Sequence, residues 1–182
     1  YSPFDQINRD TVSKLAPAWT FRTGREKVGL DQNTPLQIGD LVYSCTTTNV
    51  VIAIDADTGT ERWRFDPKVN GVMWQRCRGL GYYKLPGAQQ VAGQACNERL
   101  IMTTIDTRLM AIDTKTGKLC EGFGQNGIVS LTTDIGHISP GFYFQTSAPL
   151  VARDKVVVSG WVADNQKVGE PSGVIRAFNV VT

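Results

Sequence analysis

The stretch Val51-Ile52-Ala53-Ile54-Asp55-Ala56-Asp57-Thr58-Gly59-Thr60-Glu61-Arg62-Trp63 decides the fold, because it is repeated along the chain. It recurs as Leu109-Met110-Ala111-Ile112-Asp113-Thr114-Lys115-Thr116-Gly117-Lys118-Leu119-Cys120-Glu121, and a third copy begins as Val174-Ile175-Arg176-Ala177-Phe178-Asn179-Val180-Val181-Thr182. Aligned on their alanines, the copies are 58 residues apart from Ala53 to Ala111 and 66 apart from Ala111 to Ala177. Internal repetition at this spacing indicates a repeat architecture.

Each copy predicts a β-hairpin, because an apolar run leads into a turn that ends in Thr-Gly and a second run follows. Glycine supplies the positive φ that such a tight turn needs. Further short β-branched runs, bounded by Gly, Asp and Pro, lie at 41–48, 100–104, 128–131 and 156–159. Three repeats of about four strands each fit radially arranged sheets, whereas a β-sandwich has no reason to repeat its hairpin. The sequence therefore predicts an all-β fold, specifically part of a β-propeller.

Two features qualify this interpretation. The only helical window is residues 8–15, where Ile7, Val12 and Leu15 share one face, and we expect it to form an N-terminal turn packed on the sheet edges. The third copy stops before its glycine and its return strand, and three blades cannot close a ring. We therefore expect the chain to be part of a larger protein.

Charge and composition exclude several classes of function. Nineteen Lys and Arg against 17 Asp and Glu give a net charge of +2, without runs of like charge, so a nucleic-acid partner is not expected. No stretch approaches the ~20 apolar residues of a membrane-spanning helix.

Four cysteines, Cys45, Cys77, Cys96 and Cys120, accompany the single histidine, His137. They lack the CxxC spacing that is typical of zinc sites. They fit either two disulfides in an oxidising compartment or buried free thiols. If a bridge forms, we expect it between Cys77 and Cys96.

Several further segments resemble a known family. Tyr1-Ser2-Pro3-Phe4-Asp5-Gln6-Ile7-Asn8 and Ala18-Trp19-Thr20-Phe21-Arg22-Thr23-Gly24 resemble the opening of the quinoprotein dehydrogenases that use pyrroloquinoline quinone (PQQ). Closer matches to the membrane-bound branch, which includes glucose and quinate/shikimate dehydrogenases, are Thr34-Pro35-Leu36, Cys77-Arg78-Gly79-Leu80-Gly81-Tyr82-Tyr83, Pro140-Gly141-Phe142-Tyr143, Thr146-Ser147-Ala148-Pro149 and Glu170-Pro171-Ser172-Gly173-Val174-Ile175-Arg176-Ala177-Phe178. The resemblance implies an eight-bladed propeller, of which residues 1–182 would form about the first three blades, after a membrane anchor.

The resemblance also implies a set of cofactor-binding residues. They are Trp74, Arg78, Thr146, Ser172 and Gln32. Arg78 matches the arginine that meets a PQQ carboxylate, a contact suited to a permanently charged fork, although a salt bridge is the alternative. Thr146 and Ser172 match positions that give hydroxyl or backbone contacts to PQQ. The alternative is that both are ordinary turn residues. Gln32 stands where many relatives have a glutamate.

Trp74 bears on the substrate. Membrane-bound glucose enzymes carry a histidine at this position. An indole can stack on a flat tricyclic quinone at least as well as an imidazole. The resemblance therefore favours a cyclic polyol acid such as quinate or shikimate over glucose.

The other tryptophans and the histidine are not assigned to the cofactor site. Trp19, Trp63 and Trp161 are expected to pack between blades, and His137 is expected to lie in a solvated loop or near the substrate entrance.

The implied reaction is a two-electron oxidation of an alcohol. A carboxylate base takes the hydroxyl proton, hydride passes to PQQ, and Ca²⁺ or Mg²⁺ polarises the quinone carbonyl. The base and the cation ligands are expected outside residues 1–182, so no catalytic or metal-binding residue is assigned. The resemblance further implies ubiquinone as the electron acceptor and a location on the periplasmic face of the bacterial inner membrane.

A second hypothesis comes from a different class of protein. Non-catalytic propeller scaffolds of outer-membrane assembly share the Ala-x-Asp-x-x-Thr-Gly-x-x-x-Trp repeat and bind proteins. Cys77-Arg78-Gly79 and Thr146-Ser147-Ala148-Pro149 distinguish the two hypotheses, because a scaffold has no use for them. These motifs favour the enzyme.

Overall fold

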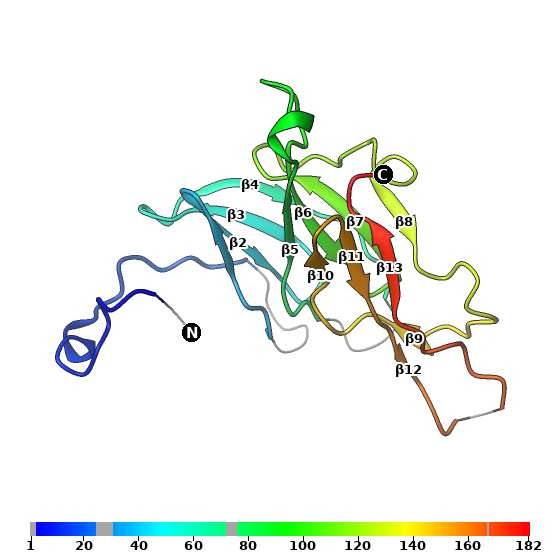
Figure 1. Ribbon diagram of the computed structural model, residues 1–182. Coiled ribbons are helices and arrows are strands. Elements are labelled where there is room, and N and C mark those ends of the chain that lie inside the picture. The colour runs from blue at the N-terminus through cyan, green and yellow to red at the C-terminus, as the bar shows by residue number, and fades with distance from the viewer. Residues whose placement is uncertain (1–2, 25–30, 72–75, 167) are drawn as a thin grey trace.

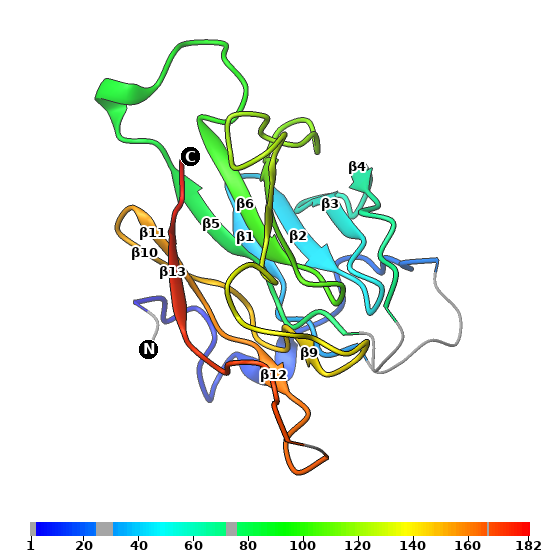
Figure 2. The same ribbon diagram turned by 90° about the vertical axis from the view of Figure 1, so that its right-hand side faces the viewer.

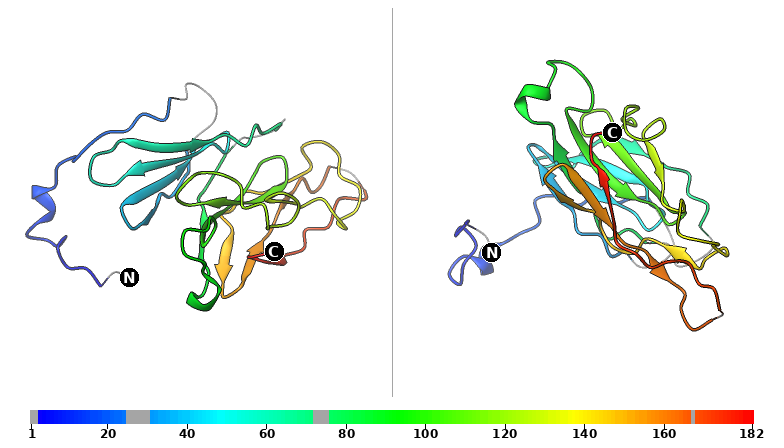
Figure 3. Two further views of the ribbon diagram at one scale, coloured as in Figure 1. Left: turned by 90° about the horizontal axis from the view of Figure 1, so that it is seen from above. Right: turned by 45° about the vertical axis from the view of Figure 1, so that its right-hand side comes forward.

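The computed structural model describes residues 3–24, 31–71, 76–166 and 168–182. Within them, three antiparallel sheets follow one another in chain order and stand side by side when seen from above (Figure 3). The first sheet contains β1 (Leu36–Ile38), β2 (Leu41–Cys45), β3 (Val51–Asp55) and β4 (Glu61–Phe65). The second contains β5 (Gly81–Lys84), β6 (Glu98–Thr103), β7 (Arg108–Asp113) and β8 (Ile128–Ser130). The third contains β10 (Leu150–Ala152), β11 (Lys155–Val158) and β13 (Arg176–Asn179).

The remaining elements are small (Figure 1 and Figure 2). β9 (Tyr143–Phe144) pairs with β12 (Trp161–Val162) in a two-stranded ladder, and two short 3₁₀ helices, η1 (Val12–Lys14) and η2 (Gly87–Gln89), lie in connections. The all-β blade architecture predicted from the repeat is confirmed. No helix in the described ranges is long and apolar enough to cross a bilayer.

Alternating side chains of each strand pack against the neighbouring sheet, as the two-residue period of a strand requires. In β6 and β7, one set of buried residues meets the first sheet: Leu100, Met102, Met110 and Ile112. The intervening residues Ile101, Leu109 and Ala111 meet the third sheet. The middle sheet is therefore buried on both faces, which explains why its two central strands read as nearly continuous apolar runs.

The repeated turn begins with the same hydrogen bonds in all three copies. Asp55 Oδ1 accepts the N–H groups of Asp57 and Thr58, at 3.2 and 2.9 Å. Asp113 and Asn179 accept the corresponding N–H groups in the second and third copies. An amide oxygen serves as well as a carboxylate in this Asx turn, so the third copy starts its turn in the same way despite its Asn179.

The return strand of the second copy differs from the prediction. β4 follows the first turn as a full strand, but after the second turn only Leu119 bridges back, to Ile112. The outer strand of that sheet is β8, formed by the run predicted at 128–131. Between Leu119 and β8, residues 120–127 turn back on themselves, and Gly127 adopts a φ of 89°.

In each copy of the repeat, the carbonyl of the second turn residue accepts a hydrogen bond from a side chain outside that copy's own sheet. Trp19 Nε1 donates to the carbonyl of Ala56 at 2.8 Å, and its ring covers Gly59. Trp63 Nε1 donates to the carbonyl of Thr114 at 2.9 Å, and its ring covers Gly117. The blade-to-blade packing predicted for Trp63 is confirmed, because Trp63 in β4 reaches the turn of the second sheet. Trp19 packs on the first sheet from the segment that precedes β1, so its partner is not a neighbouring blade among the described residues.

The joint between the second and third sheets uses an arginine. Arg99, which is 4% exposed, donates from Nη1 to the carbonyls of Val180 and Val181, at 3.3 and 2.9 Å. Val180 is the third-copy equivalent of Ala56 and Thr114. Burial lowers the pKa of the guanidinium, whereas nearby Tyr83 and Asp113 favour its charged form.

We expect Arg99→Ala to destabilise the protein by about 2 kcal/mol, because it leaves the buried carbonyl of Val180 and the partly buried carbonyls of Val181 and Cys96 without their donor. Thermal unfolding should report this loss. The matched control is Arg62→Ala, because Arg62 is an exposed arginine whose ion pair with Asp55 lies at the surface. An equal effect of the two substitutions would contradict the joint assigned to Arg99.

Three expectations were wrong. Trp161 does not pack between blades: it is 41% exposed and stacks on Phe144, with ring centroids 4.8 Å apart. The window at 8–15 forms only η1, and Ile7, Val12 and Leu15 are exposed rather than packed on a sheet edge, because this segment extends away from the sheets (Figure 1).

The third wrong expectation is the Cys77–Cys96 disulfide. The structure pairs Cys45 with Cys77 and Cys96 with Cys120, at Cα separations of 5.8 and 5.7 Å. The physical reason is topological. Cys77 lies in the connection that passes the end of β2, where Cys45 is the last residue. Cys96 lies before the start of β6, at the opposite end of the next blade.

Candidate functional site

The segments that lead into the first strand of each sheet converge. Thr34 N–H, before β1, donates to the carbonyl of Arg78, before β5, at 3.0 Å. A Cβ placed on Gly79 would lie 3.3 Å from the Cβ of Ala148, before β10. A Cβ on Gly81 would lie 3.1 Å from the carbonyl of Pro149. Glycine at these two positions therefore permits the close approach of the three entry segments.

Gln32 and Arg78 meet at this convergence. They are 46 residues apart in the sequence, yet Arg78 Nε donates to Gln32 Oε1 at 3.2 Å. Both side chains are exposed. Within the described residues, no carboxylate pairs with Arg78 and its two terminal nitrogens donate to no acceptor, so the salt bridge considered as an alternative does not form there. The guanidinium therefore presents free donors and an uncompensated positive charge, which suits a bound carboxylate.

The backbone that leads into Arg78 is fixed by two contacts. Cys77, 6% exposed, is bridged to Cys45 in the core between the first two sheets. Asn49, 1% exposed with a φ of 62°, donates from Nδ2 to the carbonyl of Arg76 at 3.1 Å. Its Oδ1 accepts Ile105 N–H at 2.9 Å, so one amide ties the Arg76 segment to both neighbouring sheets.

The other predicted site residues are placed as follows. Thr146 is half-buried and lies two residues before Ala148, in the third entry segment. Ser172 is exposed, and its N–H donates to the carbonyl of Ile135 at 2.9 Å. Neither forms a hydrogen bond with Gln32 or Arg78 in the part of the chain that the structure describes. Trp74 lies outside the described residues.

Sequence reasoning missed Gln145. Its side chain is 4% exposed, and neither Oε1 nor Nε2 has a hydrogen-bond partner among the described residues. A buried amide of this kind ordinarily binds an ordered water or a ligand. The available signal was a polar residue directly after the aromatic pair Tyr143-Phe144 and before Thr146, where a buried strand end would normally carry an apolar side chain.

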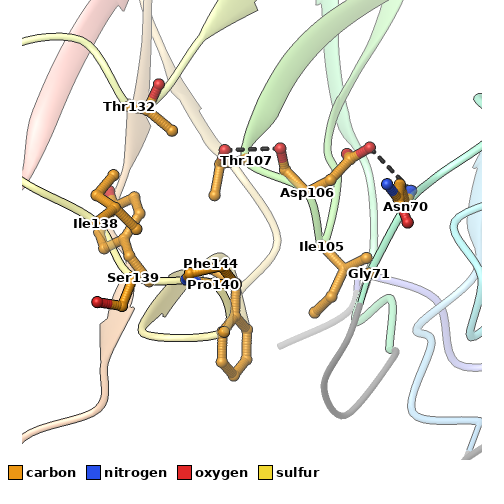
Figure 4. A pocket seen from close by; sticks show the side chains of 12 residues that line it. Asn70, Gly71, Ile105, Asp106, Thr107, Thr132, Ile138, Ser139, Pro140 and Phe144 are labelled. Carbon is orange, nitrogen blue, oxygen red and sulfur yellow. Dashed lines mark hydrogen bonds between the residues drawn. The ribbon is translucent and has the colours of Figure 1, made fainter.

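A cavity of about 400 Å³ opens at the same end of the blades (Figure 4). Ile105, Ile138 and Phe144 supply apolar surface. Asp106 and Thr107 lie on the opposite wall in Figure 4 from Ser139 and Thr132.

The carboxylate of Asp106 is already engaged. It pairs with Arg108 at 2.7 Å and accepts Asn70 N–H at 3.1 Å. Burial opposes its charged form. Hydrogen bonds from Arg108, Thr104 and the backbone of Asn70 nevertheless hold the pKa of this carboxyl below its usual range. The cavity thus offers hydroxyls and a neutralised carboxylate, which suit a hydroxylated ligand better than an anion.

Two further expectations can be placed. His137 is exposed in the connection between β8 and β9 and does not line this cavity, in agreement with a solvated loop histidine. Among the described residues, no group of three or more His, Cys, Asp or Glu side chains is arranged to hold a metal ion.

The full length of the chain, residues 1–182, matches the family model described as PQQ, glucose/ethanol/alcohol dehydrogenase, β-propeller domain. The chain belongs to this family. The quinate/shikimate dehydrogenase (quinone) of Acinetobacter baylyi is 42% identical over 98% of the chain and 24% of its own length. The quinoprotein glucose dehydrogenase of Escherichia coli is 38% identical over 100% of the chain and 24% of its own length. The chain thus spans about a quarter of the length of these relatives.

A solved structure supports the blade arrangement. The quinohemoprotein alcohol dehydrogenase of Comamonas testosteroni superposes with a TM-score of 0.76 at 25% identity, over 99% of the chain and 23% of that protein. The resemblance to PQQ-dependent dehydrogenases is therefore confirmed, and so is the preference for this family over a non-catalytic scaffold.

The residues present fit the family cofactor in one respect that the structure itself shows. PQQ is a flat tricarboxylate and needs cationic or N–H donors for its carboxylates. The exposed guanidinium of Arg78, oriented by Gln32 and otherwise unpaired within the described residues, is such a donor.

Proposed function

We propose that the chain forms part of the PQQ site of a dehydrogenase that oxidises a polyhydroxylated substrate, either a cyclic polyol acid of the quinate or shikimate type or glucose. The observation that carries the proposal is the Gln32–Arg78 pair at the meeting point of three blade entries, in a chain of this family. As the domain organisation, we propose that residues 1–182 are the N-terminal portion of a propeller of eight blades.

The proposed roles follow from the chemistry of each side chain. Arg78 holds a PQQ carboxylate through charge-assisted hydrogen bonds, and Gln32 fixes the plane of the guanidinium through Nε. Thr146 and Ser172 contribute hydroxyl or backbone contacts, and Trp74 stacks on the ring. Bound PQQ supplies the two-electron acceptor. The described residues bind and orient, and we assign proton transfer from the substrate to a carboxylate outside residues 1–182.

The same proposal includes a cation, an acceptor and a location. We propose that Ca²⁺ or Mg²⁺ is held by side chains outside residues 1–182, that electrons pass to ubiquinone, and that the protein works on the periplasmic face of the inner membrane, reached through an anchor outside this sequence. Two disulfides support the location, because disulfides persist in oxidising compartments such as the periplasm.

Substrate oxidation by the intact protein tests this proposal. We expect a higher kcat/KM for quinate or shikimate than for glucose, because Trp74 replaces the histidine of the glucose enzymes. Membranes loaded with PQQ and Ca²⁺, and the same membranes without PQQ, should be assayed with all three substrates. A preference for glucose would reverse the assignment of substrate, and turnover that does not depend on PQQ would overturn the proposed function itself.

A further inference from the structure

The structure assigns a role to the Cys45–Cys77 disulfide that its place in the core alone does not explain. The bridge ends one residue before Arg78. Its first half-cystine is the last residue of β2, so it anchors the Arg78 segment to a central strand of the first sheet. Both cysteines are almost fully buried, at 2% and 6% exposure.

The connection that carries Arg78 contains little regular structure to hold it in place. In its described parts, 66–71 and 76–80, no strand or helix forms between β4 and β5. Long irregular connections are mobile unless tertiary contacts restrain them. The restraints here cluster around Arg78: the disulfide at Cys77, the Asn49 amide on the carbonyl of Arg76, and Thr34 N–H on the carbonyl of Arg78 itself.

The side chain of Arg78 is held far less firmly than its backbone. It is exposed, and its one hydrogen bond in the described structure is the 3.2 Å contact with Gln32. A guanidinium that binds a carboxylate must lie within about 0.5 Å of its productive position. Since the side chain has little support of its own, this position depends on the backbone.

We propose that the Cys45–Cys77 disulfide is a positioning device that holds Arg78 ready for a carboxylate of the cofactor. This inference rests on the proposed function. Loss of the bridge leaves the charge of Arg78 in place but lets its backbone move, so the cofactor must order the segment as it binds. The two-electron reduction of the bridge to two thiols by a dithiol would have the same effect, which makes cofactor retention sensitive to redox conditions.

The second disulfide provides a matched control. Cys96–Cys120 closes a loop of similar length, with a sequence separation of 24 against 32, but it lies at the opposite end of the second blade. The experiment compares Cys45→Ser/Cys77→Ser with Cys96→Ser/Cys120→Ser in the intact protein and measures the Kd for PQQ by quenching of intrinsic fluorescence. We expect about tenfold weaker binding for the first pair and unchanged binding for the second, while both pairs lower the Tm.

A double-mutant cycle separates positioning from a general loss of structure. If the bridge acts through Arg78, removal of the bridge in an Arg78→Ala background should cost no further affinity. A second tenfold loss in that background would overturn the proposal. Should the serine pair fail to fold, Cys45→Ala/Cys77→Val keeps the site apolar and filled, and failure of this pair as well would make the bridge a requirement of the fold and overturn the proposal.

PQQ binding by the parent protein distinguishes a failure of the proposed function from a failure of the positioning role. If it does not bind PQQ, the proposed function fails. If it binds PQQ and the variant without the Cys45–Cys77 bridge binds equally well, the proposed function stands and only the positioning role is wrong.

Discussion

Replacing Arg78 with alanine in the intact protein is expected to weaken PQQ binding by roughly ten- to a hundredfold, because a charge-assisted hydrogen bond contributes about 1.5–3 kcal/mol and each ~1.4 kcal/mol is a factor of ten in affinity. The Tm of the protein without cofactor should barely change. Arg78 is exposed, and its side chain hydrogen-bonds only to Gln32 among the described residues, so we expect its removal to leave the core intact.

Three further variants sharpen this prediction. Arg78→Lys keeps the positive charge but loses the planar guanidinium with its paired N–H donors, so we expect an intermediate affinity for PQQ. Arg62→Ala removes an exposed arginine far from the convergence of blade entries and should leave PQQ affinity unchanged. Trp74→Ala should cost about tenfold if the indole stacks on the ring. The opposite pattern, early unfolding with normal PQQ binding by the folded fraction, would make Arg78 and Trp74 structural residues.

The strands could be predicted well because their apolar runs are fixed by local periodicity. The run at 41–48 became β2, which ends three residues earlier because the segment from Thr46 to Asn49 turns: Asn49 N–H donates to the carbonyl of Thr46 and Asn49 adopts a positive φ. Likewise the third copy enters its strand only at Arg176, and Val174 and Ile175 remain exposed. The composition of an apolar stretch predicts that a strand forms there, but it does not predict the residue at which the strand begins or ends.

The pairing of cysteines could not be predicted, because sequence spacing does not say which end of a blade each cysteine occupies. The joint between the second and third sheets was hidden for a similar reason. Arg99 lies 81 residues from Val180, and nothing in the sequence marks it as the functional equivalent of Trp19 and Trp63. Once the sheets are placed side by side, the shared acceptor position in the turn makes the equivalence plain.

The candidate site was only partly accessible from sequence. Gln32 and Arg78 came from a family resemblance, and their contact follows from the meeting of two blade entries 46 residues apart. Gln145 escaped notice because an unpartnered buried amide is visible only when its surroundings are known.

Replacing Trp63 with alanine is expected to lower the free energy of unfolding by about 3 kcal/mol, at the lower end of the range for tryptophan truncation because the side chain is only half-buried. The indole ring packs on Gly117 of the next blade and beside Tyr43, with ring centroids 5.8 Å apart. Trp63→Phe keeps most of the ring contact and loses the hydrogen bond to Thr114, so it should cost only about 1 kcal/mol. Chemical denaturation followed by far-UV circular dichroism measures both.

Gly117→Ala tests the same joint from the other side. Gly117 has a φ of 69°, and an added Cβ would lie 2.6 Å from the Trp63 ring, so the substitution introduces both backbone strain and a clash. The strain belongs to the turn, whereas the clash requires the ring. In a Trp63→Ala background the clash disappears, and Gly117→Ala should then cost clearly less than in the parent protein. Since Trp63 and Gly117 lie in different blades, this non-additivity would demonstrate that the two blades are in contact at this joint in solution, and strict additivity would place the tryptophan elsewhere.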